Sequence, residues 1–413
     1  MIVEKKGQGK YPPVPFPFLM SKNFPFAKRT DWALGSNQLM KTVELLQERK
    51  VPLLDLTESN PTKCGFRYLS KQVLTPFSHE DNLKYHPHPQ GMEGPRAALS
   101  AYYRERGYDV PPENIFLVAS TSEGYSCLFR LLANPGEHFL FPSPSYPLFP
   151  FLVDLNDVEM DFYPLVYEDG WKVDLKRLRQ GINAATRGLV FVNPNNPTGS
   201  YIKEDELGAF VQICREHHAA IISDEVFWDF NLDPSVKRLS LAGNKECLTF
   251  VLSGISKTLG LPQMKLGWIL ISGPDDLVKE ARARLEIITD TYLSVATPAQ
   301  NALTAWLSHQ GRIQTEIRDR LTQNLRYLKK STAPISTVKL LEIEGGWYAI
   351  LKIPTTLSEE RWAIKFLEED HVFVHPGYFF DFEKEGYIVV SLLPEKKIFQ
   401  DGIDRILKRI NKV

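Results

Sequence analysis

The sequence predicts an α/β fold with a large, mainly parallel sheet between helices. Short apolar runs alternate with stretches of helical periodicity such as 94–107 and 204–218. Buried strands that alternate with helices form βαβ units, and helices then cover both faces of the sheet. Ligand chemistry is expected at the carboxyl ends of such strands. The apolar runs lie at 115–119, 138–142, 188–193, 219–225, 249–254 and 265–272.

The length and the last third of the chain predict a second, smaller domain. A chain of 413 residues that is 43% hydrophobic is too long for one ordinary layer stack. Long helices are expected over 275–332, followed by strand-like segments separated by a helix, which indicates an α+β unit. We therefore predict an extended, Pro-rich and aromatic N-terminal arm (1–26), a large domain (56–298), and a small domain built from 27–55 and 299–413.

The charge balance favours a small-molecule substrate. Lys plus Arg total 49 against 50 Asp plus Glu, so the net charge of −1 offers no basic field for nucleic acid or an anionic membrane. No apolar run has the length of a signal peptide or a membrane helix, so a cytoplasmic protein is expected. Four cysteines without a CxxC pair indicate buried thiols. The cluster HPHPQ (86–90) has no evident third ligand, and we predict no metal site.

Four short motifs follow predicted strands, in the order STSEG (120–124), NPNNPTG (193–199), SDE (223–225) and SGISK (253–257). Each alone has an ordinary structural interpretation: a helix cap, a turn, a strand end and a solvated lysine. Their joint occurrence, in this order and at strand ends, favours a functional site instead.

With these motifs, the chain resembles the class I/II aminotransferase family of fold-type-I enzymes that depend on pyridoxal 5′-phosphate. The resemblance runs from about Asp55 to the C-terminus and rests on the NNPTG, SDE and SxxSK elements. It implies a large domain with a seven-stranded, mainly parallel sheet, a smaller α+β domain, and a homodimer with active sites at the interface. Its substrates would be a small-molecule amino donor and a carbonyl acceptor.

The resemblance assigns the catalytic roles to two residues. Lys257 would form the Schiff base with the cofactor aldehyde and later move a proton to and from the substrate. Asp224 would face the pyridine nitrogen and raise its pKa, which keeps the ring electron-withdrawing. Asn196 would donate to the phenolic oxygen, and the ring of Tyr146 would pack on the face of the cofactor.

The phosphate would lie over the amino end of the helix that begins near Ser120, where backbone N–H groups and the helix dipole favour an anion. Ser120, Thr121 and Ser122 would form that turn. Ser256 and Lys265 would add a hydroxyl and an ammonium group. By the same resemblance, Tyr85 would reach the phosphate of the neighbouring subunit.

Three positions depart from the family pattern. Phe227 stands where a Tyr usually donates to the phenolic oxygen, and Lys265 replaces an Arg that binds the phosphate bidentately. The third is a substrate-carboxylate Arg in a late strand, where this chain has Val389, and an apolar side chain cannot hold a carboxylate. Candidates by type for that role are Arg67, Arg96, Lys63, Lys84, His86, His88 and His375. Trp347 and Tyr348 resemble residues that line the substrate entrance.

Amino transfer is the leading hypothesis. A lyase that eliminates a β-substituent or removes a carboxylate is an alternative on the same scaffold, because sequence does not fix which Cα bond stands perpendicular to the cofactor plane. A ligand-binding module without catalysis is a minor alternative.

Overall fold

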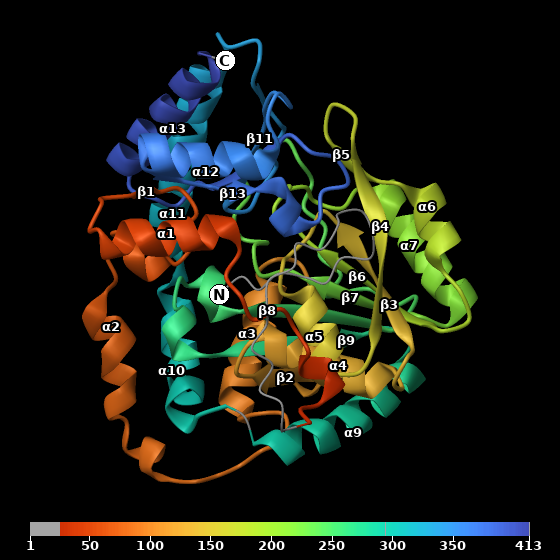
Figure 1. Ribbon diagram of the computed structural model, residues 1–413. Helices are drawn as coiled ribbons and strands as arrows, with labels where there is room; N and C mark the ends of the chain where they lie inside the picture. Colours follow the sequence, from red (N-terminus) through yellow and green to blue (C-terminus); the bar gives the residue numbers. More distant parts are fainter. Residues whose placement is uncertain (1–24, 294, 413) are drawn as a thin grey trace.

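The computed structural model describes residues 25–293 and 295–412, and the predicted arm lies almost wholly outside them. The central element is a sheet of eight strands in the order β2-β9-β8-β7-β6-β3-β4-β5, with helices on both faces (Figure 1). Strands β8, β7, β6, β3 and β4 are successively parallel, whereas β9 is antiparallel to both β8 and β2. The strands are β2 (Ile115–Val118), β3 (His138–Ser143), β4 (Glu159–Tyr167), β5 (Trp171–Val173), β6 (Thr186–Val192), β7 (Ala220–Asp224), β8 (Thr249–Gly254) and β9 (Gly267–Ser272).

The predicted mainly parallel sheet is confirmed, but it has eight strands rather than seven. The additional strand is β5, which has three residues and pairs antiparallel with β4 as a hairpin at the edge of the sheet. Six strands coincide with the predicted apolar runs because their side chains are buried on both faces, as in β2, β3, β7 and β8.

The helices around this sheet are α3 to α10. They are α3 (Glu93–Arg104), α4 (Thr121–Leu132), α5 (Phe149–Leu155), α6 (Leu175–Gly181), α7 (Glu204–His217), α8 (Ile255–Thr258), α9 (Asp275–Tyr292) and α10 (Thr297–Ser308). Ser120 begins α4 because its hydroxyl accepts the backbone N–H of Glu123 at 3.1 Å. This cap fixes the amino end of α4 directly after β2.

A second core joins both ends of the described chain. It contains α1 (Gln38–Glu48), β1 (Leu54–Asp55) and the C-terminal elements, and α1 packs against α12 (Figure 1). A four-stranded antiparallel sheet lies here in the order β10-β11-β14-β13. The remaining elements are α2 (Ser70–Leu74), α11 (Gln310–Thr332), β10 (Lys339–Leu340), β11 (Tyr348–Lys352), α12 (Glu359–Asp370), β12 (Val372–Phe373), β13 (His375–Pro376), β14 (Tyr387–Ser391) and α13 (Lys396–Ile410).

This arrangement agrees with two structural units, while the domain boundaries stay a prediction. Helix α10 lies mostly beyond the predicted boundary at 298. Its apolar side chains Ala302, Leu303 and Trp306 nevertheless belong to the core under the large sheet. It also packs against α3. On this packing we propose that the transition to the small unit lies near the start of α11 rather than at 298.

None of the helices in the described ranges combines the length and apolar character needed to cross a membrane. Within the same residues, no group of three or more His, Cys, Asp or Glu side chains is placed to hold a metal ion. All four cysteines are free and buried.

Candidate active site

The predicted motifs meet at one edge of the large sheet. Strands β6, β7 and β8 run parallel, and β2 runs in the same direction because both β2 and β8 are antiparallel to β9. The segments that follow these four strands therefore lie at the same edge. They are the turn that begins α4, the NPNNPTG segment, the SDE segment and α8, which carries Lys257.

Lys257 is enclosed by aromatic side chains. Its Nζ lies 4.8 Å from the ring centroid of Trp347 and 5.5 Å from that of Phe227. Burial lowers the pKa of Lys257 to about 8, and the nearby Asp224 carboxylate offsets only part of that change. About a tenth of this amine is therefore neutral at pH 7, and the neutral form is the one that a nucleophile requires.

Asp224 ends β7 and is only 6% exposed. Its Oδ2 accepts from Tyr125 Oη at 3.1 Å, and its Oδ1 accepts from the Val226 backbone N–H at 3.2 Å. Burial raises the pKa of Asp224 to about 6, although both hydrogen bonds and Lys257 oppose that shift. A cation placed beside this carboxylate would be strongly favoured, because it would compensate the burial of the charge.

Tyr125 is a site residue that the sequence prediction missed. It lies one helical turn after Thr121 on α4, and this spacing places both residues on the same helix face. Its hydroxyl ties α4 to the end of β7. The motif STSEGYS contains the required spacing, but only the tertiary structure shows which acid the hydroxyl reaches.

The amino end of α4 lies very close to the β8–β9 pair. A Cβ on Gly254 would lie 3.1 Å from Gly267 Cα, and a Cβ on Gly267 would lie 3.3 Å from the Thr121 backbone nitrogen. Side chains at these two glycines would push the strands and the helix end apart. The predicted anion-binding turn of Ser120, Thr121 and Ser122 is thus held beside the strand that leads to Lys257.

Asn196 and Tyr146 occupy the same region. Asn196 is 6% exposed, and its side-chain oxygen is buried with no hydrogen-bond partner among the described residues. An unpartnered buried amide oxygen is costly, so a group that donates a hydrogen bond is the natural partner. Tyr146 packs edge-on against Phe149 with ring centroids 5.7 Å apart, and burial raises the pKa of its phenol, with smaller contributions from Tyr348 and Asp224.

Other predicted residues are not brought to Lys257 by any contact among the described residues. Ser256 is adjacent to it in α8 and half-buried, whereas Lys265 is exposed. Tyr85 is 76% exposed. It lines a separate surface pocket with His86 and His88, so its predicted role needs a second subunit.

Val389 is fully buried in β14, between Ile350 of β11 and His375 of β13. His375 lies among phenylalanine rings, and burial lowers its pKa to about 4, so it is neutral at pH 7. This part of the small sheet therefore supplies no cation for a substrate carboxylate.

The remaining candidate cations lie elsewhere. Arg96 is buried and donates to the carbonyl oxygens of Gly91 and Pro112, which is a structural role. Lys63 lies 3.7 Å from Glu58, and Lys84 donates to Asp81. Arg67 lines a different pocket. None of them contacts Lys257 or Asp224 within the part of the chain that the structure describes.

A half-buried lysine amine and a buried carboxylate at adjoining strand ends of an α/β sheet are the groups expected of an enzyme that works through an amine nucleophile. Comparison with known proteins gives the family. The model for aminotransferase class I and II matches residues 55–400, and the chain belongs to that family. It is therefore an aminotransferase by family.

Two relatives and one solved structure illustrate the similarity. Glutamate-pyruvate aminotransferase AlaA of Escherichia coli (strain K12) is 26% identical over 363 residues, which cover 86% of this chain and 90% of that protein. Alanine aminotransferase of Mycobacterium tuberculosis (strain ATCC 25618 / H37Rv) is 25% identical over 371 residues, covering 86% and 84%. The structure of alanine aminotransferase from Pyrococcus furiosus superposes with a TM-score of 0.86 at 23% identity, covering 94% of this chain and all of that one.

Proposed function

We propose that this protein is a pyridoxal-phosphate-dependent aminotransferase that moves an amino group from an amino acid or amine to an oxo-acid or other carbonyl acceptor. The observation that carries the proposal is the placement of Lys257 beside Asp224 at the ends of β8 and β7, in a chain of the aminotransferase family. Pyridoxal phosphate, when bound, supplies an aldehyde for the lysine amine and a ring that withdraws electrons from the substrate Cα.

The residues at the sheet edge fit the parts of that cofactor. Asp224 would hold a proton on the ring nitrogen, since a buried carboxylate with a raised pKa gains most from a cationic neighbour. Tyr125 would keep the carboxylate in position. The side-chain Nδ2 of Asn196 would donate to the phenolic oxygen, since its Oδ1 can only accept, and the backbone N–H groups that begin α4 would bind the phosphate.

Lys257 would act twice. Its neutral amine would hold the cofactor through the cofactor's carbonyl carbon, and the same nitrogen would carry the proton to and from the substrate Cα. The rings of Trp347 and Phe227 lie 4.8 Å and 5.5 Å from this nitrogen and would limit its contact with water, which lowers the pKa of the amine.

We also propose a homodimer in the cytoplasm, with Tyr85 completing the phosphate site of the neighbouring subunit. Support for an interface comes from large apolar side chains that are exposed in the single chain. Leu83 is 89% exposed and Tyr85 76%, and on or beside α9 Ile287 is 71% and Leu293 61% exposed. Tyr85 and Leu293 line the same surface pocket, which joins the two segments into one surface.

Spectroscopy of the protein saturated with pyridoxal phosphate tests the proposal. L-Alanine or L-glutamate, added without an acceptor, should bleach the absorbance of the bound cofactor, and a 2-oxo acid should then restore it. These donors are the first to try because the relatives act on them by name. Ammonia released without an acceptor would indicate a lyase, and no response to any amine would leave only a binding role.

A further inference from the structure

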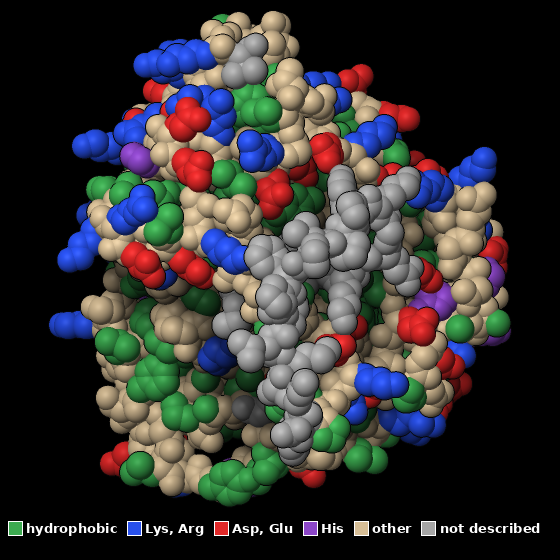
Figure 2. Space-filling view, in the orientation of Figure 1, with side chains coloured by type: hydrophobic (Ala, Val, Ile, Leu, Met, Phe, Trp, Pro, Cys, Tyr) green, Lys and Arg blue, Asp and Glu red, His purple; other side chains and the backbone are tan. Residues whose placement is uncertain are grey.

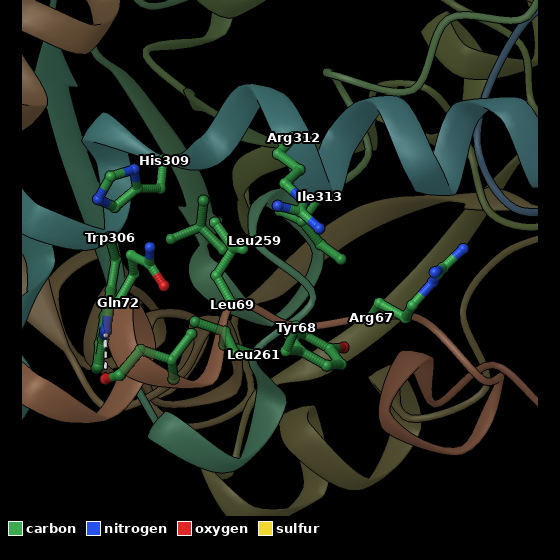
Figure 3. Close-up of a pocket in the computed structure, with 11 residues that line it drawn as sticks. Arg67, Tyr68, Leu69, Gln72, Leu259, Leu261, Trp306, His309, Arg312 and Ile313 are labelled. Carbon is green, nitrogen blue, oxygen red and sulfur yellow. Dashed lines mark hydrogen bonds between the residues drawn. The ribbon is translucent and has the colours of Figure 1, made fainter.

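A surface pocket lies behind the loop that follows Lys257. It has a volume of about 410 Å³, part of which is open to solvent. Its walls come from residues 67–73, from Leu259 and Leu261, from the end of α10 and from the start of α11 (Figure 3). None of its lining residues belongs to the candidate active site, so it is a separate feature of the molecule.

The base of the pocket is apolar. Leu259 and Leu261 are 2% and 3% exposed, and they present their side chains together with Ile313 and the indole of Trp306 (Figure 3). The indole N–H is already used, because it donates to the Val73 carbonyl at 3.0 Å. This surface therefore offers van der Waals contact and few polar groups, which suits the apolar body of a ligand.

Two polar groups at the pocket have no partner within the described residues. Arg312 makes neither a hydrogen bond nor an ion pair there, and the same holds for the amide of Gln72. Figure 3 shows the Arg312 side chain extending beside Ile313 and the Gln72 amide lying between Trp306 and Leu259. Arg67 adds a second guanidinium at the rim, where it points away from the others.

The local electrostatics favour a negative charge. Helix α11 starts at Gln310 with no acidic residue in its first turn, so no side chain of that turn offsets the positive charge of Arg312. The nearest acid on this helix with a contact to the pocket is Glu316, and its Oε1 accepts the backbone N–H of Arg67 at 3.1 Å. Within the described residues, Glu316 forms no ion pair with Arg312 or Arg67.

We propose that this pocket binds a small organic anion with a compact apolar body, such as an aryl or branched aliphatic carboxylate. The carboxylate would pair with the Arg312 guanidinium and accept from the Gln72 amide, since charge-assisted hydrogen bonds are the strongest that this set of side chains can make. The apolar body would rest on Leu259, Leu261 and Trp306. The site depends neither on the bound cofactor nor on the reaction of the enzyme.

Such an occupant would touch the segment that carries Lys257. Leu261 donates its backbone N–H to Ile255 at 3.0 Å, and Gly260 donates to the Lys257 carbonyl at 3.1 Å. Tyr68 Oη donates in turn to the Gly260 carbonyl at 2.5 Å. The pocket wall and the α8 turn are thus one hydrogen-bonded unit.

Isothermal titration of phenylacetate into the full-length protein, saturated with pyridoxal phosphate, tests the proposal. We expect saturable binding that Arg312→Met weakens by about tenfold, which is the loss of one charge-assisted contact. Arg326→Met is the matched control, because Arg326 lies on the same helix, is exposed and does not line the pocket. Phenylacetamide, which has the same shape without the charge, should bind about tenfold more weakly than phenylacetate.

Three results would overturn the proposal. They are an absence of saturable binding, equal affinity of phenylacetate for Arg312→Met and the unmodified protein, and equal affinity for phenylacetate and phenylacetamide. Circular dichroism of Arg312→Met should match the unmodified protein, since the residue is exposed and unpaired among the described residues. Binding elsewhere on the protein would be unaffected by Arg312→Met and would therefore count against the site.

Discussion

The carboxyl-end edge of the large sheet and the middle of the small sheet contrast in chemistry. At the large sheet, the buried carboxylate of Asp224 accepts hydrogen bonds from two donors, the Tyr125 hydroxyl and the Val226 backbone N–H. Lys257 lies near it. At the small sheet, Val389 is fully buried beside His375, which is neutral at pH 7. The groups that the proposed cofactor chemistry needs are present, whereas the position at which the family resemblance places a substrate-carboxylate Arg is apolar. The proposed cofactor chemistry and the recognition of a substrate carboxylate thus depend on separate parts of the molecule.

The largest expected effect is at Lys257. Lys257→Ala removes the nucleophile and the proton carrier together, so turnover should fall by at least about 10³-fold. Borohydride reduction of the protein with pyridoxal phosphate, followed by peptide mass spectrometry, should label Lys257 alone in the unmodified protein and nothing in the variant. Lys265→Ala is the control and should keep the label. Labelling of another lysine would contradict the assignment. The edge of the large sheet at Lys257 would then not be the cofactor site.

The neighbouring acids Asp224 and Glu225 provide the second test. Successive strand residues point to opposite faces, and Glu225 is bound by Ser223, Ser240 and the Leu241 backbone rather than by Tyr125. Asp224→Asn should lower kcat by about 10²-fold because the ring proton loses its carboxylate partner. Glu225→Gln should leave kcat within about threefold and act on stability instead. Equal losses of kcat in both variants would mean that Asp224 has only a structural role.

Burial of the lysine makes a prediction about pH. Only the neutral amine attacks an aldehyde, and the pKa of Lys257 is lowered to about 8 from an ordinary value of 10.5. The rate at which apoprotein takes up pyridoxal phosphate should therefore rise as the pH increases from 7 to 9 and level off above that, instead of rising up to pH 11. Stopped-flow absorbance measures this rate. A midpoint near 10.5 would show that the amine is solvated in solution.

The sheet edge that carries Lys257 and Asp224 could be located from the sequence far better than the rest of the molecule. Buried parallel strands appear in the sequence as continuous apolar runs, and the short motifs lie at their ends, as Asp224 lies at the end of β7. Strand β4 was not predicted from its own residues, because it lies near the sheet edge with several exposed positions and so lacks a continuous apolar run. The contact from Tyr125 to Asp224 joins residues 99 apart in the chain, and helix periodicity alone cannot supply such a partner.

The small-sheet end is tested by comparing L-alanine with L-alaninamide as donors. A guanidinium clamp would favour the acid by about 10²-fold or more in kcat/KM, because the amide cannot form the charged pair. With Val389 in that position, the ratio should stay within about tenfold. Steady-state kinetics with a common 2-oxo acid acceptor give the ratio. A preference for the acid well above tenfold would mean that another cation, such as one from a partner subunit, binds the carboxylate.

The smallest effect is expected at Phe227, which lies between the two regions. Its ring centroid is 5.3 Å from that of Trp347 and 5.5 Å from Lys257 Nζ. Phe227→Tyr adds a hydroxyl that can donate to the anionic phenolic oxygen of the cofactor, and a donor to the anionic form favours the deprotonated state. The pH midpoint of the bound cofactor's absorbance should therefore fall by about one unit. The phenylalanine at 230, which is also buried against Trp347, offers the control, because Phe230→Tyr should leave the midpoint unchanged. If Phe227→Tyr leaves the midpoint unchanged as well, the ring does not face the phenolic oxygen. Phe227 would then serve only the apolar packing against the small sheet and not the cofactor site.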